Sequence, residues 1–204
     1  PVFFKRTQET LRAIKIEAPD EEIRKKVLMN WDNAAKPLDG MGRFEALTAR
    51  IGAVVRNDEI DICKKAVLIM CADKGFVEEG ISQSGQEVTL AVVKSMGQKK
   101  SSVGKMAKQI GADTIPVDIG VNSEEKVPGV LDRKIRRGTR NFRMEPAMTM
   151  EEGIRAVFAG IYMVRECKER GYGILATGEM GIGNTTTSSA VAAALLDCDV
   201  AKVT

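Results

Sequence analysis

The first part of the chain carries apolar side chains at helical spacing. Pro19 precedes one such stretch and favours a helix start there. A proline and two glycines in residues 36–42 interrupt the pattern and indicate a loop. We expect three helices in this region, at residues 7–16, 20–35 and 43–55.

After residue 65 the pattern changes to short, continuous apolar runs. Residues 66–71 are six apolar residues in a row, which is typical of a strand buried on both faces of a parallel sheet. Further strands are expected at 114–121 and 172–177, and residues 200–204 form a short β-prone stretch. Helices are expected at residues 87–96, 103–110, 150–170 and 185–196. The alternation predicts an α/β fold, with a parallel Rossmann-like sheet and helices on both faces.

The helix expected at 150–170 has signals at both ends. Thr149 and Glu152 have the spacing of a capping box, and Gly171 is placed to end the helix. Its predicted apolar face holds Ile154, Val157, Phe158, Ile161 and Val164.

The helical start and the later strands predict two domains. We expect residues 1–35 to be part of a small helical domain, and residues 36–204 to be the N-terminal portion of a large parallel α/β domain. Because three or four strands are fewer than doubly wound domains usually have, we also expect further sequence beyond the C-terminus.

Composition narrows the classes of function. The formal net charge is only +3, whereas a nucleic-acid-binding protein of this size usually has a stronger basic excess. No apolar run reaches the roughly 18–20 residues that span a bilayer, and the N-terminus lacks a signal-peptide pattern, so we expect a cytoplasmic protein without a membrane partner. The chain has no histidine, and its four cysteines form no CxxC pair. These features argue against a metal site and against a histidine-activated nucleophile.

Residues 178–186, here called the glycine-rich loop, follow the strand predicted at 172–177, which we expect to be buried, and open a helix. Gly178, Gly181 and Gly183 allow the backbone to turn tightly and to approach a ligand. The unpaired N–H groups of a helix's first turn suit a phosphate. Asn184, Thr185 and Thr186 add side-chain donors at the end of the same loop.

Two other interpretations of this loop remain open. Gly181 and Gly183 fit part of a dinucleotide-binding motif with Asp199 as its distant acid, but Asp199 precedes a candidate strand instead of ending one. The loop could also be a tight strand–helix turn without a ligand. Glu179 argues against that alternative, because a carboxylate beside a phosphate site is repelled unless it has a chemical role.

Residues 73–87, here called the polar loop, follow the strand at 66–71. In an open parallel sheet the carboxyl ends of the strands share one crevice, so we expect this loop beside the glycine-rich loop. Ser82, Gln83, Ser84 and Gln86 could hydrogen-bond a planar heterocycle; alternatively they are solvated, with Ser84 or Gly85 capping the next helix. The basic run at 133–140 is interpreted as a solvated face, because acidic residues balance its charge and only one aromatic residue is near.

Six segments, in order along the chain, carry a resemblance to a known family. They are KPLDGMGRFE at 36–45, CADKGFVEEGISQSGQEVT at 71–89, VDIGV at 117–121, RGTRN at 137–141, PAMT at 146–149 and GEMGIGNTT at 178–186. Together they resemble the nicotinate-nucleotide–dimethylbenzimidazole phosphoribosyltransferases, over about residues 36–204.

The resemblance implies a pentosyltransferase of cobalamin lower-ligand assembly. Such an enzyme transfers phosphoribose from nicotinate mononucleotide to 5,6-dimethylbenzimidazole or a related base, giving α-ribazole 5′-phosphate and nicotinate. The family's members are homodimers and use no cofactor. By resemblance, Glu179 is the catalytic carboxylate, and Ser82 and Gln86 lie on the base side. The residues that would hold the nucleotide phosphate are Gly178, Gly181, Ile182, Gly183, Asn184 and Thr185.

Two departures from the family pattern affect these expectations. Lys74 stands where many relatives have histidine or asparagine. The family also continues beyond Thr204 with a second phosphate loop, a lysine and a proposed general-base glutamate. We therefore expect this chain alone to bind substrate poorly and to turn over slowly or not at all. A non-catalytic phosphate-binding module and a dinucleotide-dependent enzyme remain the alternatives.

Overall fold

The computed structural model describes residues 7–204 and divides into two compact units. Glu9–Cys63 forms one unit, and Lys64–Thr204 forms most of the other. The expected small domain, 1–35, includes residues 1–6, which lie outside the described residues. The assignment of 36–63 to the larger domain stays a prediction about the whole protein, whereas in the described residues this stretch packs with the preceding helices.

The smaller unit is helical, as expected. It contains α2 (Glu21–Asp32), α3 (Arg43–Val55) and all but the first residue of α1 (Gln8–Arg12). Helices α1 and α2 are shorter than predicted. Asp20 caps α2 by accepting hydrogen bonds from the backbone N–H groups of Glu22 and Ile23, at 3.0 and 3.1 Å. Trp31 of α2 donates a 2.7 Å hydrogen bond to Thr48 of α3, which joins the two helices.

The larger unit contains a four-stranded sheet in the order β3-β2-β1-β4, with all neighbouring strands parallel. The strands are β1 (Lys65–Ala72), β2 (Ala112–Gly120), β3 (Leu131–Asp132) and β4 (Ile174–Met180). The parallel α/β fold is confirmed. The two-residue strand β3 was not predicted. The β-prone stretch at 200–204 was assigned wrongly, because it contains a 3₁₀ helix, η2 (Val200–Lys202).

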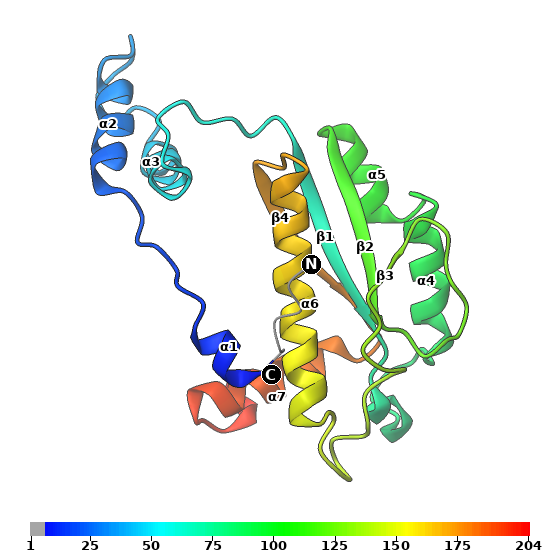
Figure 1. Ribbon diagram of the computed structural model, residues 1–204. Coiled ribbons are helices and arrows are strands. Elements are labelled where there is room, and N and C mark those ends of the chain that lie inside the picture. The colour runs from blue at the N-terminus through cyan, green and yellow to red at the C-terminus, as the bar shows by residue number, and fades with distance from the viewer. Residues whose placement is uncertain (1–6) are drawn as a thin grey trace. The chain divides into compact units, whose positions relative to one another are not determined.

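Helices cover both faces of the sheet (Figure 1), namely α4 (Glu87–Gly97), α5 (Ser102–Gln109) and α6 (Met150–Glu169). Successive residues of β1 point to opposite faces. Leu68 packs in a cluster with Met163 and Cys167 of α6, whereas Ile69 packs with Val93 and Met96 of α4. This two-sided burial explains why the sequence of β1 is continuously apolar.

Strand β4 differs from its prediction in burial and in length. It lies at the edge of the sheet among the described residues, and Ile174 is 41% exposed, so the expected full burial was wrong. The strand also continues to Met180, so Gly178 and Glu179 belong to the strand itself. The glycine-rich turn that follows is therefore shorter than the sequence indicated.

Helix α6 begins at Met150 as predicted and ends at Glu169, one residue earlier than predicted. Thr149 accepts from the Glu152 N–H at 3.1 Å, and Glu152 accepts from the Thr149 N–H at 2.7 Å, which completes the capping box. Gly171 follows in the left-handed conformation with φ +80°. The predicted apolar face is only partly right, because Phe158 is buried while Val157 and Val164 are about half exposed.

Candidate functional site

The polar loop and the glycine-rich loop lie together at the carboxyl ends of β1 and β4. These strands pair in parallel, with Cys71 opposite Met180, so the segments that follow leave the sheet at the same edge. The backbone N–H of Ile182 donates to the Thr89 hydroxyl at the start of α4, at 3.2 Å. Lys74 of the polar loop also lies 2.8 Å from Glu179 of the glycine-rich loop, so the expected proximity of the two loops is confirmed.

Two glycines give the turn its shape. A Cβ atom on Gly181 would lie 2.1 Å from the carbonyl oxygen of Ala72, so no larger residue fits without backbone movement. Gly183 has φ +86°, a conformation that glycine adopts readily, and it faces the side chains of Phe76 and Ile81 in the polar loop.

Helix α7 (Asn184–Leu196) begins directly after this turn. Gly183 is its N-cap and provides no side-chain hydrogen bond to the first turn. The Asn184 N–H donates to the Gly181 carbonyl at 3.1 Å. The positive end of the helix dipole lies at the remaining N–H groups of the first turn. Asn184 and Thr185 line the adjoining depression, so this arrangement suits an anionic group.

Glu179 is held by a partner on each carboxylate oxygen. Its Oε1 lies 2.8 Å from the Lys74 Nζ, and its Oε2 accepts a hydrogen bond from the Asn184 side-chain amide. The Glu179 side chain is 40% exposed, whereas that of Lys74 is only 11% exposed. Glu179 therefore joins the polar loop, through Lys74, to the first residue of α7.

This group borders a depression of about 750 Å³ on the larger unit. Polar residues occupy one side of it, while Val191, Ala192 and Leu195 of α7 supply an apolar side. The polar residues that line it are Lys74, Glu179, Asn184, Thr185, Thr187, Ser188 and Ser189. The depression can therefore take a ligand that has both a charged and an apolar part.

The two predicted base-side residues make hydrogen bonds within the polar loop. Gln86 donates through Nε2 to the carbonyl oxygen of Lys74 at 3.0 Å, and the Ser82 hydroxyl accepts from the Ser84 N–H at 3.2 Å. Gln86 is also the N-cap residue of α4, so the alternative in which Ser84 or Gly85 caps this helix is wrong. Neither Ser82 nor Gln86 lines the depression described above.

The segment around residues 139–143 braces the polar loop, whose 3₁₀ helix is η1 (Gly75–Glu79). The Gly75 N–H donates to the Thr139 hydroxyl at 3.1 Å, and the rings of Phe76 and Phe142 lie 4.4 Å apart. Glu79 accepts from Asn141 at 2.7 Å and pairs with Arg143. The hydrogen bond from Asn141, together with the Arg143 charge, lowers the pKa of Glu79.

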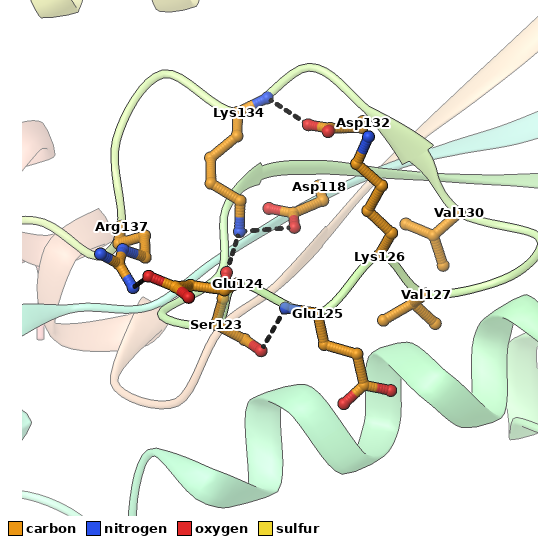
Figure 2. Close-up of a pocket in the computed structure, with 10 residues that line it drawn as sticks. All are labelled: Asp118, Ser123, Glu124, Glu125, Lys126, Val127, Val130, Asp132, Lys134 and Arg137. Atoms are coloured by element: carbon orange, nitrogen blue, oxygen red, sulfur yellow. Dashed lines mark hydrogen bonds and ion pairs between the residues drawn. The ribbon is translucent and has the colours of Figure 1, made fainter.

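A second cavity, of about 420 Å³, lies at the carboxyl ends of β2 and β3 (Figure 2). The Lys134 ammonium fills its hydrogen-bonding capacity there, since it lies 2.8 Å from the Asp118 carboxylate and donates to the carbonyls of Val121 and Ser123. Arg137 pairs with Glu124 at 2.7 Å. The basic run at 133–140 thus has acidic partners, in agreement with the charge balance inferred from the sequence.

Asp199 does not occupy the place of a dinucleotide-binding acid. It caps η2, where its carboxylate accepts a 2.9 Å hydrogen bond from the Ala201 N–H. A dinucleotide-binding acid stands at the end of the next strand of the sheet. The structure therefore gives no support to the dinucleotide interpretation.

Comparison with known proteins places the chain in a family. A family model described as phosphoribosyltransferase matches residues 16–204. The chain belongs to this family. The resemblance seen in the six sequence segments is confirmed, because curated relatives carry the name nicotinate-nucleotide–dimethylbenzimidazole phosphoribosyltransferase.

Two of these relatives and one solved structure illustrate the similarity to the family. The Clostridium perfringens protein is 43% identical over 92% of this chain, and the Clostridium tetani protein is 38% identical over 99%. A crystal structure of the enzyme of the same name from Thermus thermophilus matches 88% of this chain, with a TM-score of 0.82 and 36% identity.

The chain spans about half the length of the family members that it matches. It covers 52% of the C. perfringens protein, 55% of the C. tetani protein and 55% of the T. thermophilus chain. Within the part of the chain that the structure describes, no helix is long and apolar enough to cross a membrane.

Proposed function

We propose that this protein carries out the phosphoribosyl transfer for which its relatives are named. Nicotinate mononucleotide would donate phosphoribose to 5,6-dimethylbenzimidazole or a related base, giving α-ribazole 5′-phosphate and nicotinate for the lower ligand of cobalamin. The observation that carries the proposal is the position of Glu179, which contacts both the polar loop through Lys74 and the start of α7 through Asn184.

The donor phosphate is assigned to the glycine-rich loop and the start of α7. Backbone N–H groups would face the phosphate, and its negative charge would lie at the positive end of the helix. The residues proposed for the phosphate site are Gly178, Gly181, Ile182, Gly183, Asn184 and Thr185. Ile182 would contribute through its position in the turn, because its own N–H already donates to the Thr89 hydroxyl. Gly178, within β4, would support the turn from the strand side.

Glu179 is the proposed catalytic residue. When the glycosidic bond breaks, nicotinate leaves with the bonding electron pair, and positive charge develops on the ribose ring. A carboxylate close to that ring stabilises the charge. A ring nitrogen of the acceptor base then bonds to the anomeric carbon from the opposite face, with inversion, and the acceptor loses a proton to a general base.

The acceptor side is assigned to the polar loop, with Ser82 and Gln86 as its proposed base-side residues. No residue of this chain is assigned as the general base, so slow or absent turnover by the 204-residue chain remains the expectation. A homodimer, a cytoplasmic location and a reaction without a cofactor remain part of the proposal.

Calorimetry and a single-turnover assay test this function together. We expect the chain to bind nicotinate mononucleotide more tightly than NAD. With an excess of the chain and with 5,6-dimethylbenzimidazole added as the acceptor, mass spectrometry should then detect α-ribazole 5′-phosphate and nicotinate in equal amounts. Tighter binding of NAD would reject the proposal. Binding of nicotinate mononucleotide without any product at long incubation times, both by this chain and by a version extended to the length of its relatives, would identify a binding module instead of an enzyme.

A further inference from the structure

We infer that Lys74 is a positioning residue, which keeps the glycine-rich loop receptive to phosphate by neutralising Glu179. The inference rests on the proposed function, because that proposal places the phosphate at this loop. It gives a role to a lysine that departs from the family pattern in the polar loop.

The ion pair lies directly against the turn. A Cβ atom on Gly181 would lie 3.0 Å from both the Glu179 Oε1 and the Lys74 Nζ, and these two atoms are themselves 2.8 Å apart. Any anion that approaches the backbone of this glycine is therefore close to both charges. The Lys74 charge must offset that of Glu179 if the anion is to bind there.

Without Lys74, the Glu179 carboxylate beside the glycine-rich loop would have no positive charge to neutralise it. Asn184 draws that carboxylate toward the first residue of α7 by donating to its other oxygen. A carboxylate at the N-terminus of a helix interacts with the same positive end that a phosphate needs. It also repels the phosphate, and at a separation of several ångströms near a protein surface this repulsion weakens binding by roughly tenfold or more.

The contacts of Lys74 keep its ammonium group close to Glu179. Its side chain is nearly buried, its ammonium lies 3.4 Å from the Ala72 carbonyl, and its own carbonyl accepts from Gln86 at 3.0 Å. Among the described residues that line the depression, Lys74 is the one with a positive charge. No other residue of that lining can therefore replace its charge.

A double-mutant cycle measured by calorimetry tests the inference, with inorganic phosphate and nicotinate mononucleotide as the probes. We expect Lys74→Gln to weaken the binding of both by about tenfold or more. Lys74→Arg should recover most of the affinity, because it restores the charge. Glu179→Gln alone should bind both probes at least as tightly as the unmodified chain.

The double variant distinguishes an indirect role from a direct one. If Lys74 acts through Glu179, then Lys74→Gln combined with Glu179→Gln should bind within about threefold of Glu179→Gln alone. Lys126→Gln, an exposed lysine of the second cavity, serves as the control and should bind as the unmodified chain does.

Several outcomes would overturn the inference. A double variant as weak as Lys74→Gln would mean that Lys74 contacts the phosphate directly or only supports the fold. Unchanged binding in Lys74→Gln would also reject the role. If the unmodified chain binds inorganic phosphate but not nicotinate mononucleotide, the proposed function fails while the cycle with phosphate still decides the role of Lys74. If it binds neither probe, both ideas are wrong.

Discussion

Gly181 faces the backbone of Ala72 so closely that a Cβ atom would lie 2.1 Å from the Ala72 carbonyl oxygen. The end of β1 therefore determines the path of the glycine-rich loop as it leaves β4. Gly181→Ala should push the loop away from β1, lower the free energy of unfolding by about 1–3 kcal/mol and weaken the binding of nicotinate mononucleotide. Urea unfolding and calorimetry measure the two effects.

Gly153→Ala in α6 is the matched control for this substitution. A Cβ atom there would meet no heavy atom within 4 Å. Alanine inside a helix is favoured over glycine by roughly 0.5–1 kcal/mol, so this variant should be slightly more stable and should bind normally. Equal effects of the two substitutions would contradict the close packing of Gly181 on Ala72.

Glu179→Gln should separate chemistry from binding. The amide keeps the size of the carboxylate but cannot supply its charge to the developing oxocarbenium ion. The single-turnover rate should fall by about 100-fold or more, while the affinity for nicotinate mononucleotide should not fall. Product formation followed by mass spectrometry gives the rate. A variant that retains the full rate would remove Glu179 from the mechanism.

The capping box of α6 should make stability depend on pH. The hydrogen bond from the Thr149 N–H is the main cause that lowers the pKa of Glu152, with Arg140 and Arg136 adding to it. Because folding lowers this pKa, the ionised Glu152 stabilises the folded state fully at pH values above 4.5, the ordinary pKa of glutamate. This stabilisation is lost as the pH falls through the lowered pKa of the folded state. Glu152→Gln should therefore be less stable than the unmodified chain at neutral pH. The difference between their free energies of unfolding should become smaller in acid.

Urea unfolding at several pH values measures this difference. Glu151→Gln removes the same charge from the same turn of α6 but lies outside the capping box, so it is the matched control. A difference between Glu152→Gln and the unmodified chain that stays constant into acid would show that the capping carboxylate is not the cause.

The buried cysteines should resist alkylation in the folded protein. Burial raises the pKa of Cys71 to about 12, and it also raises the pKa of Cys167. Because the thiolate is the reactive form, iodoacetamide should modify the exposed Cys63 first at neutral pH, and Cys71 and Cys167 only after unfolding in urea. Peptide mass spectrometry identifies the modified positions. Rapid labelling of Cys71 in the native protein would contradict its burial.

Local sequence patterns predicted most of the fold. The continuous apolar run of β1 was informative because packing on two opposite faces leaves no place for polar side chains. The spacing of Thr149 and Glu152 likewise located the start of α6, since both hydrogen bonds lie within one helical turn. Strand β3 was missed because two residues carry no periodicity. Residues 200–202 form a 3₁₀ helix capped by Asp199, despite the β-propensity of Val200.

The candidate site was predictable only in part. The turn at Gly181 and Gly183 leaves a local signature, so the loop could be located from the sequence. The contact between Lys74 and Glu179 joins residues 105 positions apart, and no local pattern reports which side chains meet across a sheet edge. The general rule that parallel strands end in one crevice brought the two loops together, but it did not say that a lysine would meet the carboxylate.

Phe76 joins the polar loop to the glycine-rich loop. Its ring lies 4.4 Å from that of Phe142, and it also lies 3.3 Å from the place that a Cβ atom of Gly183 would occupy. Under the proposed function, a mutation that changes the shape of the polar loop for a different acceptor base also shifts the side chains that pack on the glycine-rich loop, which holds the donor. Changes of acceptor preference during evolution should therefore come with compensating changes around Gly183. Ancestral or laboratory lineages that switch acceptor should show this dependence as epistasis between the two loops.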